Sequence, residues 1–300
     1  MGQSQNPLFL FLLLVLVYGV SSTTFTVVNQ CSYTVWPGLL SGAGTAPLPT
    51  TGFSLNPTET RVIPPPAAWS GRIWGRTLCT QDATTGKFTC VTGDCGSSAV
   101  ECSGSGAAPP ATLAEFTLNG AGGLDFYDVS LVDGYNIPMA IVPQGGGDAS
   151  GVAGNCTITG CVKELNGPCP AQLKVATTGT ADGVACKSAC EAFGTPEYCC
   201  SGAFATPDTC KPSEYSLFFK NACPRAYSYA YDDGTSTFTC AGADYLITFC
   251  PSPNPSVKSA KKEGVLEPEA VSYSSASPTL STVFSVGVLA VAFWALQRVW

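Results

Sequence analysis

The chain has 300 residues, only 12% of them are charged, and its formal net charge is −7. An acidic chain lacks the basic face that nucleic-acid binding needs, which excludes that class of partner. The chain also contains no histidine, so a Ser-His-Asp or Cys-His catalytic device cannot be built. If the protein catalyses a reaction, carboxylates must supply the acid–base chemistry.

The first 22 residues have the features of a signal peptide. Residues 8–20 are almost unbroken Leu, Val and Phe. At about a dozen residues, this run suits the apolar core of a signal better than a membrane span. Val20 and Ser22 supply the −3 and −1 residues of a cleavage site, so we expect the mature chain to begin at Thr23. The alternative is a buried core strand.

Sixteen cysteines lie between Cys31 and Cys250, and an even count in a secreted segment is typical of a disulfide framework. Metal binding is the other common use of cysteine. The missing histidine and the absence of any Cys-x-x-Cys motif argue against the usual zinc spacings. We therefore expect disulfides in an extracellular protein, with no metal and no other cofactor.

Strand-forming sequence dominates the region from Thr23 to Cys250. The 32 glycines and 23 prolines leave few long helices. β-Branched and aromatic residues, many in alternation with polar ones, favour the two packed sheets of a sandwich. The expected strands are residues 25–28, 33–36, 113–118, 129–132, 237–240 and 245–249.

The cysteine-rich part of the chain, about residues 155–225, has a different texture. Gly, Pro and polar residues replace the alternating pattern, which predicts a loop-rich lobe held by bridges. Two short helices are expected, at 182–193 and 213–221. A separate hairpin at 79–102 is predicted to carry its own disulfide staple.

The composition changes again after residue 251. Residues 252–279 are rich in Pro, Ser and charge and predict a disordered linker. Residues 280–300 form a hydrophobic tail. Ser274 and Ser275 precede it and resemble a glycosylphosphatidylinositol (GPI) attachment site, so we expect a GPI signal that holds the protein at a membrane. A short tail anchor is the alternative.

Residues 86–95 read GKFTCVTGDC and closely resemble the signature of the thaumatin-like proteins, a plant pathogenesis-related family that includes osmotin and thaumatin. Further sequence blocks resemble motifs of the same family and occur in the same order, and the resemblance covers roughly residues 24–251. These blocks are GRIWGRT at 71–77, PPATLAEFTL at 109–118, DFYDVSLVDGYNIPM at 125–139, EYCC at 197–200 and AYSYAYDD at 226–233.

The resemblance implies a mainly β fold: a thaumatin-like β-sandwich with a disulfide-rich loop and helix lobe and a small stapled hairpin. Sequence alone cannot choose among the possible cysteine pairings. The family pattern, carried over, gives eight. They are Cys31–Cys250, Cys79–Cys90, Cys95–Cys102, Cys156–Cys240, Cys161–Cys223, Cys169–Cys186, Cys190–Cys199 and Cys200–Cys210.

The family also has an acidic cleft between sandwich and lobe, and its motifs carry over to Arg72, Glu115, Asp128 and Asp133. Alternation places Glu115 and Asp128 opposite the apolar face of their strands. That pattern alone fits acids that merely solvate a strand face; the resemblance favours a cleft.

The fifth cleft position, assigned to the block at 223–227, holds Arg225 where relatives have Asp. If the guanidinium of Arg225 faces Asp128 or Asp133, it lowers that acid's pKa and alters the cleft.

The resemblance implies a secreted or cell-surface plant defence protein that binds β-1,3-glucan or related wall glycans and acts against fungi. One alternative is a weak endo-β-1,3-glucanase, with Glu115 as proton donor and Asp128 or Asp133 as nucleophile or base. Another is a structural or receptor-like surface protein. We expect a monomer in the apoplast or cell wall, whose sequon at Asn155 is partly glycosylated because its middle residue is a bridge cysteine.

Overall fold

Two β-sheets form the body of the domain. The computed structural model describes residues 23–146, 154–178 and 183–253 of the 300-residue chain. The predicted signal peptide, the tail with Ser274 and Ser275, and nearly all of the predicted linker lie outside these residues. Within the described ranges, no helix has the length and apolar character needed to cross a membrane.

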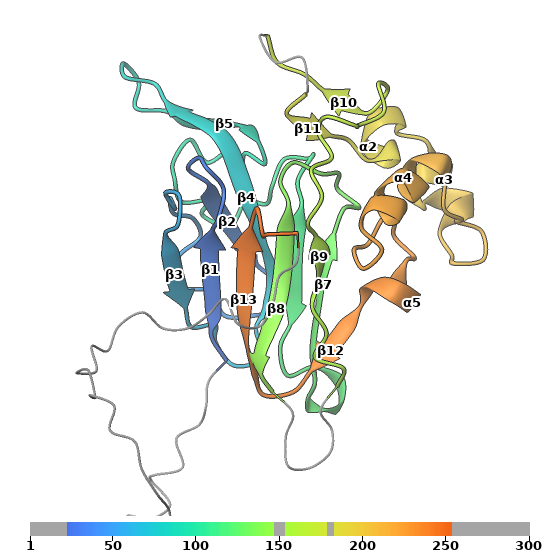
Figure 1. Cartoon of the computed structure of the whole chain (residues 1–300), viewed down its shortest axis with the longest axis horizontal. Helices are drawn as coiled ribbons and strands as arrows, with labels where there is room; N and C mark the ends of the chain where they lie inside the picture. The colour runs from blue at the N-terminus through green and yellow to red at the C-terminus, as the bar shows by residue number, and fades with distance from the viewer. Residues whose placement is uncertain (1–22, 147–153, 179–182, 254–300) are drawn as a thin grey trace, which may run out of the picture. The chain divides into compact units, whose positions relative to one another are not determined.

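The first sheet has five strands in the order β3–β1–β13–β8–β9. β1 runs parallel to β13, and the other neighbours are antiparallel. The sheet therefore joins the two ends of the domain, because β1 is its first strand in the chain and β13 its last (Figure 1). The bounds are β1 Phe25–Asn29, β3 Thr60–Ile63, β8 Met139–Gly145, β9 Thr159–Cys161 and β13 Ala243–Phe249.

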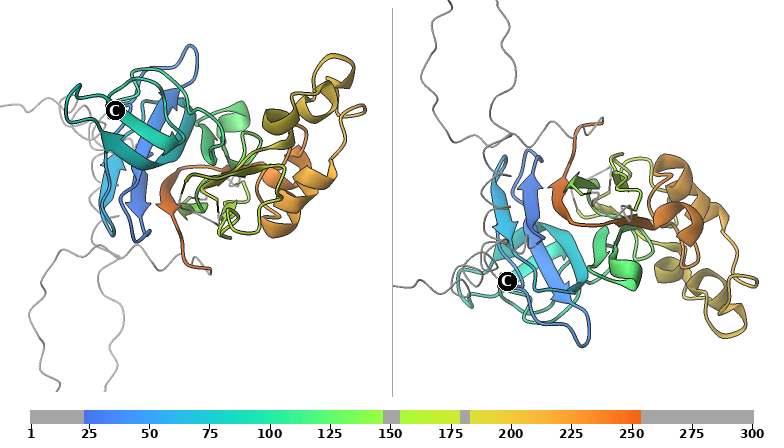
Figure 2. Two further views of the ribbon diagram at one scale, coloured as in Figure 1. Left: turned by 90° about the horizontal axis from the view of Figure 1, so that it is seen from above. Right: turned by 90° about the horizontal axis from the view of Figure 1, so that it is seen from below.

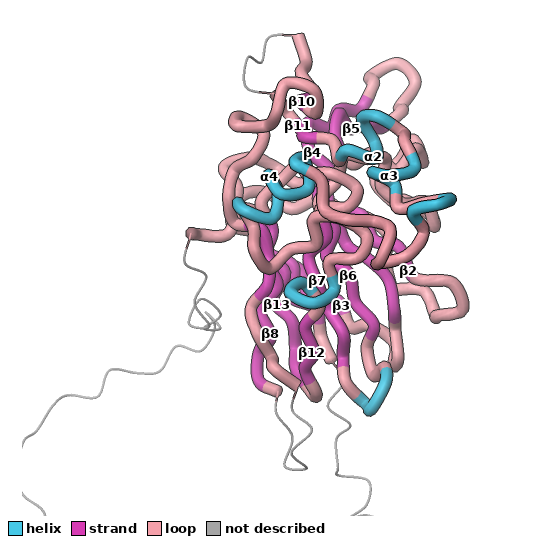
Figure 3. The backbone as a smooth tube through the Cα atoms, turned by 90° about the vertical axis from the view of Figure 1, so that its right-hand side faces the viewer, coloured by secondary structure: helices cyan, strands magenta, loops and turns pink. Residues whose placement is uncertain are grey.

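The second sheet is antiparallel, in the order β12–β7–β6–β4–β2, and β5 pairs with the end of β4 as a hairpin. Figure 3 shows the strands of the domain running side by side. This sheet carries the candidate site. The bounds are β2 Trp36–Ser41, β4 Ser70–Gln81, β5 Phe88–Thr92, β6 Leu113–Thr117, β7 Asp125–Ser130 and β12 Phe238–Cys240.

Aromatic side chains fill the space between the two sheets. The Phe116 ring from β6 lies 4.7 Å from Phe25 of β1 and 5.2 Å from Tyr245 of β13, centroid to centroid. Tyr127 of β7 is 5.2 Å from the same Tyr245 ring, and all four side chains are buried. Burying each such side chain stabilises the fold by about 1.5–3 kcal/mol. The apolar face of the sandwich is therefore fixed by alternate residues of β6 and β7.

Short helices and a two-stranded ribbon make up a lobe beside the sandwich. In Figure 2 the helices of the lobe lie on the side of the domain away from β1 and β3. A 3-10 turn, η1 (Ala121–Gly123), joins β6 to β7. The lobe and its flanking segments comprise β10 Lys174–Val175, β11 Ala185–Cys186, α2 Ala189–Phe193, α3 Pro196–Cys199, η2 Gly202–Phe204, α4 Glu214–Ala222 and α5 Asp233–Ser236.

Three expected elements differ from the structure. The strand expected at 129–132 is shifted, because β7 spans Asp125–Ser130 and a turn follows it. The helix expected at 182–193 is wrong in its first half. Ala185–Cys186 is a strand that pairs with β10, and the backbone of Cys186 also forms a β-bridge with that of Tyr135. Only α2 is helical, beginning after Ser188, whose hydroxyl accepts a hydrogen bond from the Glu191 N–H. The strand expected at 33–36 begins only at its last residue and continues through β2.

The eight expected disulfides are all present, and no cysteine of the described chain is free. Three of them, Cys169–Cys186, Cys190–Cys199 and Cys200–Cys210, lie within the lobe. Cys161–Cys223 and Cys156–Cys240 tie the ends of the lobe to each other and to β12. Disulfides thus crosslink the lobe, and buried lobe residues such as Leu173 and Phe219 also join the hydrophobic core.

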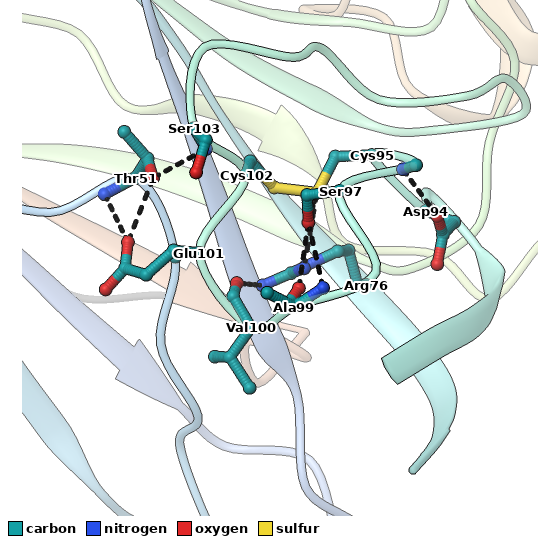
Figure 4. The surroundings of a disulfide bond; sticks show 12 residues. Thr51, Arg76, Asp94, Cys95, Ser97, Ala99, Val100, Glu101, Cys102 and Ser103 are labelled. Atoms are coloured by element: carbon teal, nitrogen blue, oxygen red, sulfur yellow. Dashed lines mark hydrogen bonds between the residues drawn. A yellow bond between two sulfur atoms is a disulfide. The ribbon is translucent and has the colours of Figure 1, made fainter. Parts of the chain in front are cut away.

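A buried arginine holds the loop closed by Cys95–Cys102 (Figure 4). Arg76 is fully buried and forms no ion pair within the described chain; its guanidinium donates to the carbonyls of Trp36, Pro37 and Val100. Glu101 closes the other side of the loop by accepting hydrogen bonds from the Thr51 N–H and hydroxyl. The hairpin region is therefore a rigid part of the domain.

Candidate functional site

Three polar residues stand in register across three neighbouring strands of the second sheet. Arg72 of β4 lies opposite Glu115 of β6, and Glu115 lies opposite Asp128 of β7. Because Ala114 and Val129 are buried in the core, the adjacent Glu115 and Asp128 point to the outer face. The prediction that these two carboxylates face away from the core is confirmed.

A cavity of about 410 Å³ opens over this row. Asp133 reaches it from the turn after β7, where Gly134 adopts φ +84° and a Cβ would lie 2.7 Å from a Cys186 carbonyl and a Pro110 side chain. Such a turn requires glycine. The opposite wall comes from the segment around α5. Four of the five predicted cleft residues, Arg72, Glu115, Asp128 and Asp133, line this one cavity.

The cavity favours protonated carboxyls at its floor. Burial raises the pKa of Asp128 to about 8, and the charges of Glu115 and Asp233 add to the shift. Asp128 Oδ2 is buried and has no hydrogen-bond partner in the described chain. Burial also raises the pKa of Glu115. The charge of Asp133 raises this pKa further, whereas the nearby Arg72 lowers it. A buried carboxyl without a partner is a strong candidate for proton donation or ligand binding.

The rim of the cavity is more open. The Arg72 guanidinium lies 3.9 Å from Asp133 Oδ2, and the two side chains are 38% and 43% exposed. An ion pair this exposed contributes little to stability, about 0–1 kcal/mol. Both groups are therefore free to exchange this contact for a ligand.

Arg225 is not brought to the cavity, which corrects the prediction for the fifth position. Its side chain is exposed, its guanidinium donates to the Ile158 carbonyl at 2.9 Å, and it forms no ion pair with any described carboxylate. The Arg225 carbonyl accepts from the Thr159 hydroxyl, which directs this segment along β9. The premise that Arg225 faces Asp128 or Asp133 is wrong.

Asp233 lines the cavity instead, and sequence reasoning missed it. It is the second acid of the block at 226–233, and its Oδ1 accepts a hydrogen bond of 2.8 Å from the Tyr227 hydroxyl. The neighbouring Asp232 has a different role, because it forms a half-buried 2.9 Å ion pair with Lys220. Two adjacent aspartates look alike in sequence, and only the fold separates the structural one from the one that faces the cavity.

Two further hollows adjoin this cavity. One of about 540 Å³ shares Arg72, Glu115 and Asp128 and extends past Phe126. Another of about 360 Å³ shares Val132, Asp133 and Ala230 and extends into the helical lobe. The three hollows are continuous through these shared residues, from the outer face of the second sheet to the helical lobe.

Two other predicted features concern bound groups. Among the described residues, no group of three potential ligands is arranged to hold a metal ion. Asn155 is exposed, and its Oδ1 accepts a hydrogen bond from the Thr239 N–H, beside the Cys156–Cys240 bridge. Glycosylation of Asn155 stays a prediction. The eight disulfides place the domain in an oxidising compartment, so it is a secreted domain.

Known proteins resemble this chain over most of its length. The thaumatin family model matches residues 29–251. Thaumatin-like protein 1 of Arabidopsis thaliana is 57% identical over 81% of this chain and 92% of its own length. Pathogenesis-related thaumatin-like protein 3.5 of Cryptomeria japonica is 56% identical over 77% of this chain and 91% of its own.

A longer relative shares the same part. The PR5-like receptor kinase of Arabidopsis thaliana is 49% identical over 87% of this chain, but the match covers only 39% of that protein. The motifs, the eight disulfides, the two sheets and these matches agree, and the chain belongs to the thaumatin family, among the plant thaumatin-like, pathogenesis-related proteins.

Proposed function

We propose that the domain is a plant defence protein that binds β-1,3-glucan or a related wall glycan in the acidic cavity and thereby acts against fungi. The observation that carries this proposal is the row of Arg72, Glu115 and Asp128 across three strands, with Asp133 and Asp233 at the rim. The wall polysaccharide is the partner, and the domain acts as a monomer.

The chemistry of the groove suits a chain of neutral sugars. Carboxyls that are protonated both donate and accept hydrogen bonds, which matches the paired hydroxyls of a pyranose. The unpartnered Asp128 Oδ2 lacks a donor that a sugar hydroxyl supplies. Tyr227 and Phe126 line the same row of hollows and offer ring faces and edges for contact with the C–H surface of a sugar.

The test is a pull-down on insoluble β-1,3-glucan with Glu115→Gln/Asp128→Asn. We expect this double variant to lose at least about tenfold in affinity, since two charge-capable hydrogen-bonding groups change together. Asp208→Asn is the matched control, because Asp208 is exposed and lies outside the row. Retention of wild-type binding by the double variant refutes a glucan site in this cavity.

A weak endo-β-1,3-glucanase is the second candidate. Glycoside hydrolysis needs two carboxyl groups that flank the scissile bond. Glu115 and Asp128 are opposed on neighbouring strands, and Asp133 lines the same cavity. A raised pKa at both suits a proton donor better than a nucleophile, so Asp133 is the candidate base or nucleophile. Release of reducing ends from laminarin, abolished in Glu115→Gln, separates this activity from binding alone.

For the C-terminal tail we propose a GPI anchor attached at Ser274 or Ser275, which holds the defence domain at the plasma membrane. Phosphatidylinositol-specific phospholipase C then releases the protein from membranes. Protein that stays bound with Trp300 intact is tail-anchored instead, and this result favours the receptor-like alternative that the kinase relative suggests.

A further inference from the structure

The hollow of about 360 Å³ in the helical lobe contains an acid that the proposed glucan site does not use. Glu191 lies in the first turn of α2 and lines this hollow, which we call the Glu191 pocket. Its Oε2 is buried and has no hydrogen-bond partner in the described chain. Its Oε1 has only a long contact, 3.9 Å, with Lys187 Nζ. The Glu191 side chain is 20% exposed, but its Oε2 atom is held out of water without a donor that would compensate it.

A second acid faces the same space. Asp133 lines both the Glu191 pocket and the acidic cavity. Burial raises the pKa of Glu191 to about 7; the charge of Lys187 lowers this pKa, and the charge of Asp133 raises it. Glu197 also lines the pocket. A cation placed here relieves the repulsion between carboxylates and gives Oε2 its missing donor.

The remaining wall suits a sugar ring. Tyr198, Tyr229 and Phe219 line the pocket together with the Cys190–Cys199 bridge. In the described chain the hydroxyls of Tyr198 and Tyr229 make no hydrogen bond to protein, so both are available to a ligand. Tyr198 is fixed from behind by Phe193 and Tyr215, at 5.4 and 5.9 Å between ring centroids. An aromatic wall with free hydroxyls beside a half-buried acid has the features of a preformed binding site.

We propose that the Glu191 pocket binds the ammonium group of an amino sugar, a 2-amino-2-deoxy-pyranose unit of a glycan chain, with Glu191 and Asp133 as its acceptors. The inference rests on the proposed glycan-binding function, because Val132, Asp133 and Ala230 belong to both hollows and let one chain occupy both. The pocket thus selects deacetylated chains over acetylated ones, since an acetamido group carries no charge and adds bulk.

The experiment is calorimetric titration of the disulfide-intact protein at neutral pH with three tetrasaccharides: one of glucosamine, one of N-acetylglucosamine and one of β-1,3-linked glucose. We expect Glu191→Gln to weaken glucosamine binding at least about tenfold, the loss typical of a charge-assisted hydrogen bond, and to leave the glucose tetramer within about twofold. Glu214→Gln is the matched control, because Glu214 is exposed in the first turn of α4 and lies outside the pocket. An unchanged melting temperature verifies that each variant is folded.

Several outcomes overturn the proposal. Wild-type protein that binds no glucosamine tetramer, equal binding of the acetylated tetramer, or a Glu191→Gln variant that binds as wild type each refutes it. Loss of glucosamine binding in Glu115→Gln but not in Glu191→Gln assigns the amine to the acidic cavity instead. Failure of the glucose tetramer alone refutes the proposed glucan function, while Glu191-dependent glucosamine binding still supports the pocket.

Discussion

Neighbouring residues of one face carry different chemistry because their surroundings differ. Glu115 and Asp128 are paired across β6 and β7, but Arg72 lies opposite Glu115 and opposes the effect of burial there. Asp128 has no basic neighbour of this kind and two acidic ones, Glu115 and Asp233. Its proton is therefore held more tightly than an aspartate's usually is, and this has a consequence for stability.

Asp128→Asn should change how stability depends on pH. The pKa of Asp128 is raised from 3.8 to about 8 in the folded protein, so folding binds a proton between these values. The resulting stabilisation is fully present below about pH 4 and is lost as pH rises to about 8. The neutral Asn removes this titration, so the variant should match wild type near pH 4 and exceed it near pH 8 by about 5 kcal/mol.

Denaturant unfolding with the disulfides intact, at these two pH values, measures the effect of Asp128→Asn. Asp208→Asn serves as the exposed control. A difference between Asp128→Asn and wild type that does not change with pH shows that Asp128 ionises normally in the folded protein.

Arg225→Asp, which the sequence suggested would retune the cleft, should leave glucan binding unchanged within about twofold. The Arg225 side chain contacts the Ile158 carbonyl rather than the cavity, and its loss costs about 1 kcal/mol of stability through that hydrogen bond. Asp233→Asn, by contrast, changes a residue that lines the cavity and should weaken binding. Glucan pull-down compares the two variants, and a clear change in Arg225→Asp contradicts this placement.

At the scale of elements, the sequence predicts best where one face alternates over several residues. The strands at 113–118 and 245–249 agree with β6 and β13 within two residues, because their apolar positions pack in the core. The helix at 182–193 failed because its first part pairs with β10, a tertiary contact that local pattern does not encode. Arg72, Glu115 and Asp128 were predicted because their sequence blocks match the family's motifs, and only Glu115 lies within an expected strand. Asp233 was missed because Asp232 and Asp233 look alike in sequence, and only the fold brings Asp233 to the cavity.

Arg76 stabilises the loop closed by Cys95–Cys102 through hydrogen bonds, in addition to the apolar contacts of the two cysteines. Arg76→Lys should destabilise the domain by about 3–5 kcal/mol, because an ammonium cannot reach the Trp36, Pro37 and Val100 carbonyls together and those groups stay buried. Burial lowers the Arg76 pKa to about 10, so the group remains charged at neutral pH.

Denaturant unfolding measures this loss, and proteolysis should first cut the loop closed by Cys95–Cys102. Arg61→Lys is the control, since Arg61 is exposed on β3 and its guanidinium lies over the Phe53 ring. Equal stability of the two variants indicates that the disulfide alone holds the loop.

At the scale of the whole domain, both the disulfides and the hydrophobic core stabilise the fold. The hydrophobic core extends from the sandwich into the lobe, and three bridges that close short loops crosslink the lobe in addition. The Cys31–Cys250 bridge is different in kind, because it joins residues separated by 219 positions and lies beside the β1–β13 pair that connects the ends of the domain. Its loss should therefore weaken the entire fold rather than one segment.

We accordingly expect Cys31→Ser/Cys250→Ser to lose more stability than Cys200→Ser/Cys210→Ser, whose cysteines are 10 positions apart. In the chain-entropy model, a disulfide stabilises the fold by lowering the entropy of the unfolded chain. This contribution is about 5 kcal/mol for the longer loop and about 3 kcal/mol for the shorter one. The Cys156–Cys240 bridge shortens the path between Cys31 and Cys250, but the logarithmic dependence makes this a small correction. Calorimetric unfolding of both double variants measures the difference. A larger loss in the lobe variant means that native contacts of the lobe, and not the entropy of the unfolded chain, determine what each bridge contributes.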